Sequence, residues 1–484
     1  MVSTTATFFA VAAAAVGALT IPQPSPRSLA VEPPRYTAFG DAVQIAARDG
    51  QQLKVRIDNK LGKEVSVYIQ GKVDNNYVMV TLDESGASTF TPVPAQPAPQ
   101  GAISASGAAP EGKVGVVTRD GNSTSSAPQD LRISIPLEGK DFLIPGYMES
   151  SRIYISEEPT LQFLAQEPAD PNGAPGIVQP DFLNPSIPGA NTSWGFMEFN
   201  YSPSELFVNL SFVDFLGLVL GMEMSYNGDG GQTSDSVGGP TKDALRNVCD
   251  NLDSLSDQPD GMDWSVLCQR DNTGKPLRVI SPEKYMSNLA GADSPFTTYF
   301  DGYVDRVWQE YAERELIVNT QDDGNGHETA DGFKVHCKVD KDSDQLVCLG
   351  GDNQPVANFT RPTSRDIFGC AGEGPFAITG ADSLVKKEIV PRLCAGFTRS
   401  TLLLGEGSDP QQHTDQVGKV SYYQEPITNH YARLVHDQLR NGRGYAFAYD
   451  DVNLDPTDAN ENTAGVIEQA NPVQLTITVG GFDA

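Results

Sequence analysis

Hydrophobic and polar residues alternate through much of the first half of the chain. Every second residue is apolar in segments 53–57 and 65–69, and strand-like runs recur at 77–82, 131–135 and 153–155. A period of two is typical of strands that bury one face. Because helical spacing is missing from this half, the pattern predicts an antiparallel sandwich or barrel.

The spacing becomes helical in the second half. Leu245, Val248, Cys249 and Leu252 fall at positions i, i+3, i+4 and i+7, behind Pro240-Thr241, which predicts a helix with one buried face. Further helical faces, which are expected to pack into a core, lie at 300–311, at 384–393 with a kink at Pro391, and at 427–439, ending near Gly442. Strand-like runs follow at 445–449 and 474–479.

These patterns predict a mainly β protein with a mixed α/β part. We expect a β-barrel or sandwich lobe at 41–226, a mixed α/β lobe at 227–440, and C-terminal strands at 441–484 that close the domain. The Gly- and Ser-rich segment 227–239 is expected to be a loop. A groove between the two lobes is the expected ligand site.

The N-terminus has the features of a secretory signal. Residues 1–18 contain an apolar stretch that ends in small residues, which predicts a signal peptide cleaved after Ala18. The Pro-rich segment 19–40 is expected to be extended, and 91–111 is expected to be a surface insertion. Since no later apolar stretch is long enough to span a bilayer and no apolar C-terminal tail suggests a lipid anchor, we expect a secreted protein without a membrane segment.

Six cysteines all lie after residue 240. An even number in a secreted chain favours disulfides, and six cysteines allow 15 pairings. Pairing in sequence order gives 249–268, 337–348 and 370–394. No CxxC or HExxH pattern is present, so no metal site is expected.

The net charge of -29 and the pI near 4.4 argue against a nucleic-acid partner, which would need a basic face. A neutral polysaccharide fits an acidic protein without electrostatic penalty. We expect a monomer without a cofactor. The N-glycosylation acceptors are Asn122, Asn191, Asn209 and Asn358, and Asn209 lies in an apolar run where burial would prevent modification.

The strongly apolar stretch 194–224 contains carboxylates. Glu198 stands inside FMEF and Asp214 inside FVDF, and Glu223 in MEM is a weaker case. Acidic residues are rarely buried unless they are paired or functional. Each carboxylate is therefore either half of a structural ion pair or part of an acid/base pair. Glycoside hydrolysis is the commonest chemistry that needs two fixed carboxylates.

The spacing of these two acids sets a geometric condition. A tight hairpin at 202–205 would pair Glu198 with about Asn209 and leave Asp214 about 16 Å along the strand. Two carboxyl groups that act together as acid and base in an inverting hydrolysis are roughly 6.5–9.5 Å apart. If the pair is catalytic, the segment must bend or loop more widely. Side chains on opposite faces of the sheet, or an acid sealed from solvent against an arginine, would contradict the hypothesis.

Several ordered blocks resemble glycoside hydrolase family 64, the secreted endo-β-1,3-glucanases of thaumatin-like architecture. WGFMEFNY and LFVNLSFVDFLGLVLGM form the core block, and later blocks lie at 296–311, 361–370, 392–403, 428–436 and 442–452. The likeness covers roughly residues 40 to 484. It implies a β-barrel lobe and a mixed α/β lobe that flank a wide groove.

The resemblance also implies roles for individual residues. Glu198 would be the general acid, kept protonated by an apolar setting, and Asp214 the general base of an inverting hydrolysis of β-1,3-glucan. Asn200 and Ser202 stand where bacterial members carry Thr and Asn near the cleavage subsite, and Phe207 stands where an aromatic residue could stack on a sugar.

Asp450 and Asp451 resemble an acidic block of thaumatin-like proteins, which implies either a place in the groove or a structural role. Two other classes stay open from the residues alone. One is a thaumatin-like wall protein that binds glucan without cutting it, and the other is an inert secreted scaffold.

Overall fold

The computed structural model describes residues 52–482 except 75, 94–129, 167–175, 185–186, 257–261, 291–293, 321–333, 351–352, 371–373, 380–381, 405–421, 441 and 453–462. The expected signal peptide, the segment 19–40, Asn122 and most of the insertion 91–111 lie outside the described residues.

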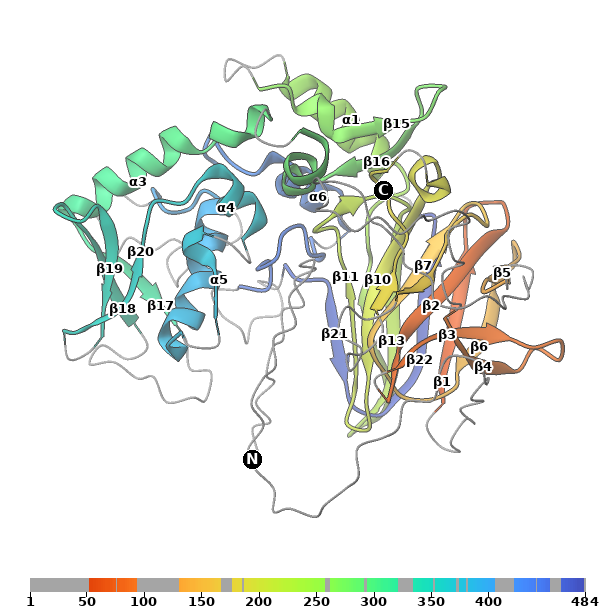
Figure 1. Ribbon diagram of the computed structural model, residues 1–484. Coiled ribbons are helices and arrows are strands. Elements are labelled where there is room, and N and C mark those ends of the chain that lie inside the picture. The colour runs from red at the N-terminus through yellow and green to blue at the C-terminus, as the bar shows by residue number, and fades with distance from the viewer. Residues whose placement is uncertain are drawn as a thin grey trace, which may run out of the picture.

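One lobe is a sandwich of two sheets (Figure 1). The larger sheet has the order β21-β11-β10-β7-β2-β3-β4, with β5 paired to β2. Its strands are β2 (Val65–Val73), β3 (Asn76–Leu82), β4 (Ser88–Pro92), β5 (Ile133–Ile135), β7 (Met148–Ser156), β10 (Trp194–Tyr201), β11 (Leu206–Leu210) and β21 (Val466–Gln469).

The smaller sheet has the order β14-β13-β22-β1-β6, in which β1 and β22 are parallel and the other pairs antiparallel. Its strands are β1 (Leu53–Asn59), β6 (Lys140–Ile144), β13 (Leu220–Gly228), β14 (Gly231–Val237) and β22 (Pro472–Val479). A separate pair consists of β8 (Leu164–Gln166) and β9 (Gly176–Val178).

The alternating apolar residues fill the space between the two sheets. Val55 and Ile57 from β1, and Val67 and Ile69 from β2, are fully buried in one hydrophobic cluster. Burying an aliphatic side chain of this size contributes about 1.5–3 kcal/mol relative to leaving it exposed. The period of two thus decides which face of each strand packs inward, and the predicted mainly β architecture is confirmed.

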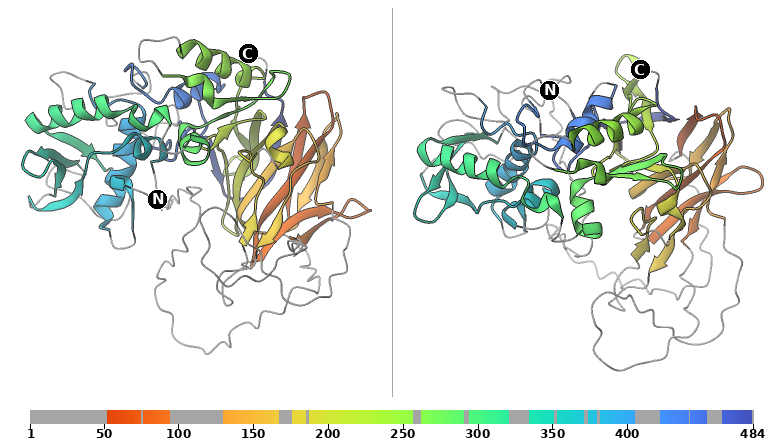
Figure 2. Two further views of the ribbon diagram at one scale, coloured as in Figure 1. Left: turned by 45° about the horizontal axis from the view of Figure 1, so that its top comes forward. Right: turned by 90° about the horizontal axis from the view of Figure 1, so that it is seen from above.

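The second lobe combines helices with small sheets (Figures 1 and 2). Its helices are α1 (Ala244–Leu255), α2 (Pro282–Lys284), α3 (Asp301–Glu313), α4 (Ser364–Gly369), α5 (Leu384–Thr398) and α6 (His430–Gln438). One sheet is β17 (Leu316–Asn319), β18 (Lys334–Asp340), β19 (Gln345–Leu349) and β20 (Pro355–Phe359), and the other joins β12 (Phe215–Leu216), β16 (Pro276–Ile280) and β15 (Cys268–Arg270).

The four expected helices correspond to α1, α3, α5 and α6. Pro391 lies inside α5 as expected. The three disulfides are Cys249–Cys268, Cys337–Cys348 and Cys370–Cys394, so the pairing in sequence order is confirmed. No helix in the described part of the chain is long and apolar enough to cross a membrane.

Two predictions from the pattern were wrong. The Gly-rich segment after Asn227 is not a loop, because β13 and β14 form a hairpin that turns between Gly228 and Gly231. The run 445–449 is not a strand. Tyr445 makes an isolated bridge with Ser211, and the chain then turns. The apolar residues of this run are typical of a strand, but Gly442 and Gly444 just before them favour turns.

Candidate active site

Glu198 lies on the outer face of the larger sheet. Along β10, Met197 and Phe199 point into the sandwich core, so Glu198 and Phe196 point the other way. The side chain of Glu198 keeps 17% of its surface exposed. Glu198 therefore lies at the surface because it alternates with the core residues along the strand.

The setting of Glu198 is polar, so the apolar setting expected for it was wrong. Arg152 lies directly opposite Glu198 on β7. Its Nε and Nη2 donate hydrogen bonds to Oε1 of Glu198 at 3.0 and 2.8 Å. Both donors bind the same oxygen. Because both side chains remain partly exposed, Glu198 is paired with an arginine but is not sealed from solvent.

Arg152 is itself held in place. Its Nη1 donates to Oε1 of Gln179 at 2.7 Å, and Nε2 of Gln179 donates to Oε1 of Gln70 at 3.1 Å. The guanidinium also lies 4.9 Å from the centre of the Phe196 ring, a favourable cation–π contact. A chain of side chains from three segments thus fixes the orientation of the group that binds Glu198.

Asp214 reaches this face through a bend in the chain. The register pairs Glu198 with Asn209, as the tight hairpin predicted. β11 then ends at Leu210, and the chain folds back over β10, where Leu218 N donates to the carbonyl of Trp194 at 3.0 Å. The chain therefore bends after Leu210 and does not continue as a straight hairpin strand.

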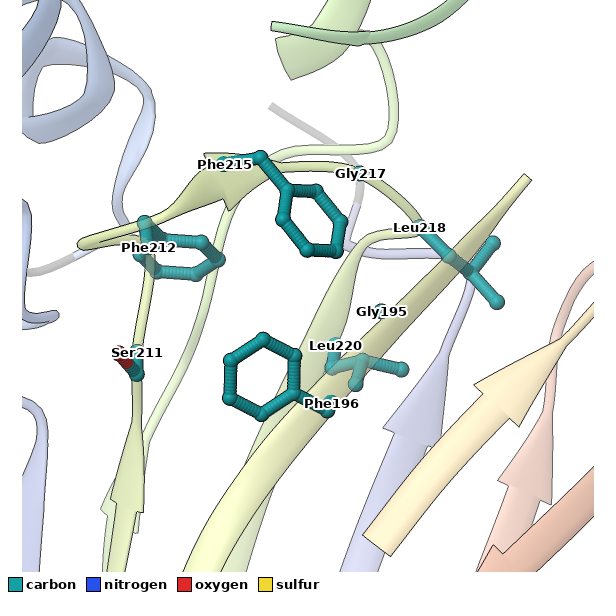
Figure 3. A pocket seen from close by; sticks show the side chains of 8 residues that line it. All are labelled: Gly195, Phe196, Ser211, Phe212, Phe215, Gly217, Leu218 and Leu220. Atoms are coloured by element: carbon teal, nitrogen blue, oxygen red, sulfur yellow. The ribbon is translucent and has the colours of Figure 1, made fainter. Parts of the chain in front are cut away.

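Aromatic packing and two glycines hold the bend against β10. Figure 3 shows Phe212, Phe215 and Phe196 around a small hollow beneath it. A Cβ on Gly217 would overlap the carbonyl oxygen of Trp194, and one on Gly195 would overlap that of Leu218. None of the eight residues that line this hollow is a carboxylate. These residues pack the bend against β10 and do not form the acid site.

A short segment of the second lobe holds Asp214 from the other side. Ser281 N donates to the carbonyl of Asp214 at 3.0 Å, and Lys284 Nζ lies 3.4 Å from Oδ1. Burial lowers the pKa of Lys284, but Asp214 and Glu283 more than offset this effect. The ammonium therefore stays charged beside Asp214, whose side chain is 14% exposed.

Glu198 and Asp214 both affect the pKa of Tyr154 and the pKa of Arg152. Burial raises the pKa of Tyr154 to about 12, an effect that Arg152 opposes and that Glu198 and Asp214 reinforce. Burial also lowers the pKa of Arg152, but Tyr154, Glu198 and Asp214 together raise it above its ordinary value. These shared interactions indicate that the bend brings Asp214 near the face of the sheet that carries Glu198.

Three of the expected substrate-binding residues lie at the hairpin that carries Glu198. Asn200 is exposed, pairs with the half-buried Phe207 across the strands, and accepts a hydrogen bond from Ser150 N at 2.7 Å. Ser202 lies in the turn, where its hydroxyl accepts hydrogen bonds from the backbone N–H groups of Ser204 and Glu205.

The adjacent aspartates have different surroundings. Asp450 is fully buried and bonds Arg399 at 3.1 Å, His436 at 2.8 Å and Ala446 N at 2.8 Å. Burial raises the pKa of Asp450, but His436, Arg399 and the Ala446 N–H bring it below its ordinary value. These contacts leave no surface for a polysaccharide, so they fit the structural role.

Asp451 interacts with Tyr445, which Glu198 also affects. It is half-buried, and burial raises its pKa to about 6, while its own backbone N–H and a hydrogen bond with Tyr445 lower it and Asp450 raises it. Burial also raises the pKa of Tyr445, with contributions from Asp451, Asp450 and Glu198. Sequence reasoning missed Tyr445, Arg152 and Lys284, because residues far apart in the chain supply them and no motif marks them.

His430 is buried and has a ring nitrogen 3.1 Å from the carbonyl of Pro426, and His436 contacts Asp450. Among the described residues, no group of three or more His, Cys, Asp or Glu side chains is placed to hold a metal ion.

Glycoside hydrolases use a pair of carboxyl groups, and Glu198 on β10 and Asp214 in the bend are both partly exposed. The chain belongs to glycoside hydrolase family 64, the β-1,3-glucanases, since the family model matches residues 51–479. The resemblance of the sequence blocks is thereby confirmed.

Two curated relatives are glucan endo-1,3-beta-glucosidases, from Cellulosimicrobium cellulans and from Arthrobacter sp. (strain YCWD3). Each is 27% identical to this chain over 276 residues, which is 57% of this chain and 44% of the relative. The match therefore spans less than half the length of these relatives.

Two solved structures share the fold. A laminaripentaose-producing beta-1,3-glucanase in complex with laminaritetraose aligns with a TM-score of 0.62 at 24% identity, and a beta-1,3-glucanase domain from Clostridium beijerinckii aligns with a TM-score of 0.59 at 19% identity. Each alignment covers 89% of this chain and 98% of the solved chain.

Proposed function

We propose that this protein is a secreted endo-β-1,3-glucanase that inverts the anomeric configuration, with Glu198 as general acid and Asp214 as general base. The observation that carries the proposal is that both acids are partly exposed and interact with the same arginine and tyrosine. Membership of the family and the laminaritetraose bound by a relative of the same fold support the substrate class.

The hydrolysis needs one proton donor and one proton acceptor. Glu198 gives its proton to the glycosidic oxygen while the bond from that oxygen to C1 breaks. Asp214 takes a proton from a water whose oxygen bonds to C1 from the opposite face of the sugar. The leaving chain thus gains a hydroxyl hydrogen from Glu198, and the two carboxyl groups return to their starting states by proton exchange with solvent.

The cations beside the two acids have different geometries. Arg152 holds Oε1 of Glu198 with two hydrogen bonds, so Oε2 is the oxygen that can carry the transferable proton. Lys284 Nζ lies 3.4 Å from Oδ1 of Asp214. The acid role also requires a neighbour of Oε2 that accepts a hydrogen bond from the proton and then stabilises the carboxylate that is left.

The remaining assignments form part of the same proposal. Asn200, Ser202 and Phe207 extend the site along the hairpin, with Phe207 available to stack on a sugar, and Asp451 borders it beside Tyr445. The two lobes of a thaumatin-like architecture would flank the groove that binds the glucan. Three disulfides fit an oxidising, extracellular compartment.

We expect the protein to release reducing ends from laminarin, and the new ends to have the α configuration. Inversion follows from attack of water on the face opposite to the leaving oxygen. Proton NMR of fresh product, recorded before mutarotation, measures the configuration. Early β-anomer would refute inversion. If the protein binds laminarin but releases no reducing ends, it is a glucan-binding protein and not an enzyme.

The bend offers a second test of this site. Gly217→Ala is expected to lower the rate of laminarin hydrolysis by up to about 100-fold, because a Cβ there pushes the bend from β10 and displaces Asp214. The measurement is kcat for a variant whose circular dichroism matches the wild type.

Gly302→Ala is the matched control for this substitution. Gly302 lies in α3 of the other lobe and has open space where the Cβ would stand. Wild-type kcat in both variants would mean that the close contact between the bend and β10 does not position Asp214.

A further inference from the structure

Asn209 lies in an unusual position beside the proposed acid. It is directly opposite Glu198 in the ladder between β10 and β11, while Arg152 is directly opposite on the other side. Side chains opposite each other in antiparallel strands lie close together on the same face. Glu198 is therefore flanked by an arginine from β7 and an asparagine from β11.

The oxygen of this asparagine has no hydrogen-bond partner within the described part of the chain. Asn209 is 92% buried, and its Oδ1 atom accepts no hydrogen bond there. A buried acceptor without a donor costs free energy, and native proteins rarely retain one without a reason. On its other side, Asn209 pairs with Val466 of β21, whose apolar side chain offers no donor.

The hydrogen bonds of Glu198 are correspondingly one-sided. Both hydrogen bonds from Arg152 to Glu198 go to Oε1, and no side chain among the described residues is bonded to Oε2. A protonated Oε2 is a donor, and an amide oxygen is a suitable acceptor for it. After proton transfer Oε2 becomes an acceptor, and the same amide can offer its NH₂ group instead.

We propose that Asn209 is a positioning residue that binds Oε2 of Glu198 in both protonation states, while Arg152 fixes Oε1. The proposal rests on the proposed hydrolase function and names the group which that mechanism requires. In the free enzyme the proton on Oε2 is held by the amide oxygen. It moves to the glycosidic oxygen when substrate binds, and the amide NH₂ then stabilises the carboxylate.

The other charged and titratable groups near Glu198 come from three segments. Arg152 and Tyr154 belong to β7, Asp214 belongs to the bend, and Tyr445 and Asp451 belong to the chain after α6. None of them lies opposite Glu198 on β11. A substitution at Asn209 therefore alters the contact with Oε2 and leaves these groups in place.

Two substitutions test the proposal by different means. Asn209→Leu removes both polar atoms with little change of volume, so we expect kcat on laminarin to fall at least about tenfold, with KM nearly unchanged. Urea unfolding of the same variant shows whether it is folded, so that a loss of kcat can be assigned to the lost contact with Oε2. Asn209→Asp places a second carboxylate beside Glu198, so the alkaline limb of the kcat/KM profile should move up by about one pH unit.

Asn358→Asp is the matched control. Asn358 is an exposed asparagine on β20 of the other lobe, and the same change there should leave kcat and the pH profile as in the wild type. Since Asn209→Leu could fail to fold, the pH profile of Asn209→Asp keeps the proposal open to refutation.

The possible results are distinct. Wild-type kcat in Asn209→Leu together with an unmoved profile in Asn209→Asp would overturn the positioning role while leaving the hydrolase function intact. A higher KM at unchanged kcat would mean that Asn209 binds a sugar hydroxyl, and would also overturn it. Absence of laminarin cleavage by the wild type would refute the hydrolase function, and the positioning role with it.

Discussion

Glu198→Gln is expected to lower kcat on laminarin by about 10²–10⁴-fold, the usual contribution of a general acid. The glutamine keeps the shape of the side chain and can still accept from Arg152 through its amide oxygen, but it has no acidic proton to give. The leaving sugar would then depart as an alkoxide. Reducing-end release at several pH values measures the loss.

Asp214→Asn should show a loss of similar size, because an amide cannot accept the proton of the attacking water. Glu223→Gln is the matched control, since Glu223 lies in the same apolar stretch but is exposed on β13. Wild-type activity in either of the first two variants would remove that residue from the mechanism. A loss in Glu223→Gln as large as in Glu198→Gln would point to a general effect of charge.

Asp450→Asn is expected to lower the free energy of unfolding by about 3–5 kcal/mol, the usual cost of breaking a buried ion pair. Arg399 is fully buried and would keep its charge without the carboxylate. Its other hydrogen bonds go to the backbone carbonyls of Asp450 and Val452 and to the hydroxyls of Tyr422 and Thr463, which carry no charge to neutralise it. Urea unfolding at pH 7 measures the change.

The adjacent Asp451 provides a control of opposite sign. Burial raises the pKa of the Asp451 carboxyl to about 6, so the folded state binds its proton more tightly than the unfolded state does. The resulting stabilisation is complete below the ordinary pKa of aspartate and is lost as the pH rises through 6. Asp451→Asn should therefore raise the free energy of unfolding at pH 8 by up to about 3 kcal/mol and change it little at pH 4. For Asp450, whose pKa is lowered, stability should fall as the medium becomes acidic. Equal destabilisation by both substitutions at pH 8 would contradict these opposite environments.

The strands and helices could be predicted from local pattern, whereas the disulfide pairs rested on an assumed pairing in sequence order. A strand that buries one face must alternate, and a helix that buries one face must repeat near every third and fourth residue. The run 445–449 shows the limit of such reasoning. Its apolar residues resemble a strand, but Tyr445 pairs only with Ser211, and a turn follows.

The candidate site was predicted only in part. Residue type and neighbours were enough to single out Glu198 and Asp214, because an acid among aromatic residues needs an explanation. The same reasoning gave Glu198 an apolar setting, which was wrong since Arg152 stands opposite it. Strand pairing between distant segments decides such neighbours, and a sequence without aligned relatives carries no signal of it.

The sequence by itself singled out Glu198 and Asp214 as candidate acids and predicted that a tight hairpin pairs Glu198 with Asn209. Only the tertiary structure decided that the chain turns back after Leu210 and brings Asp214 over β10. The physical reason is that the turn depends on contacts with remote partners, namely the carbonyl of Trp194, the backbone of Ser281 and the hydroxyl of Tyr431. Local spacing fixes the direction of a side chain relative to its own strand, whereas the separation of two acids depends on what the rest of the fold packs between and around them.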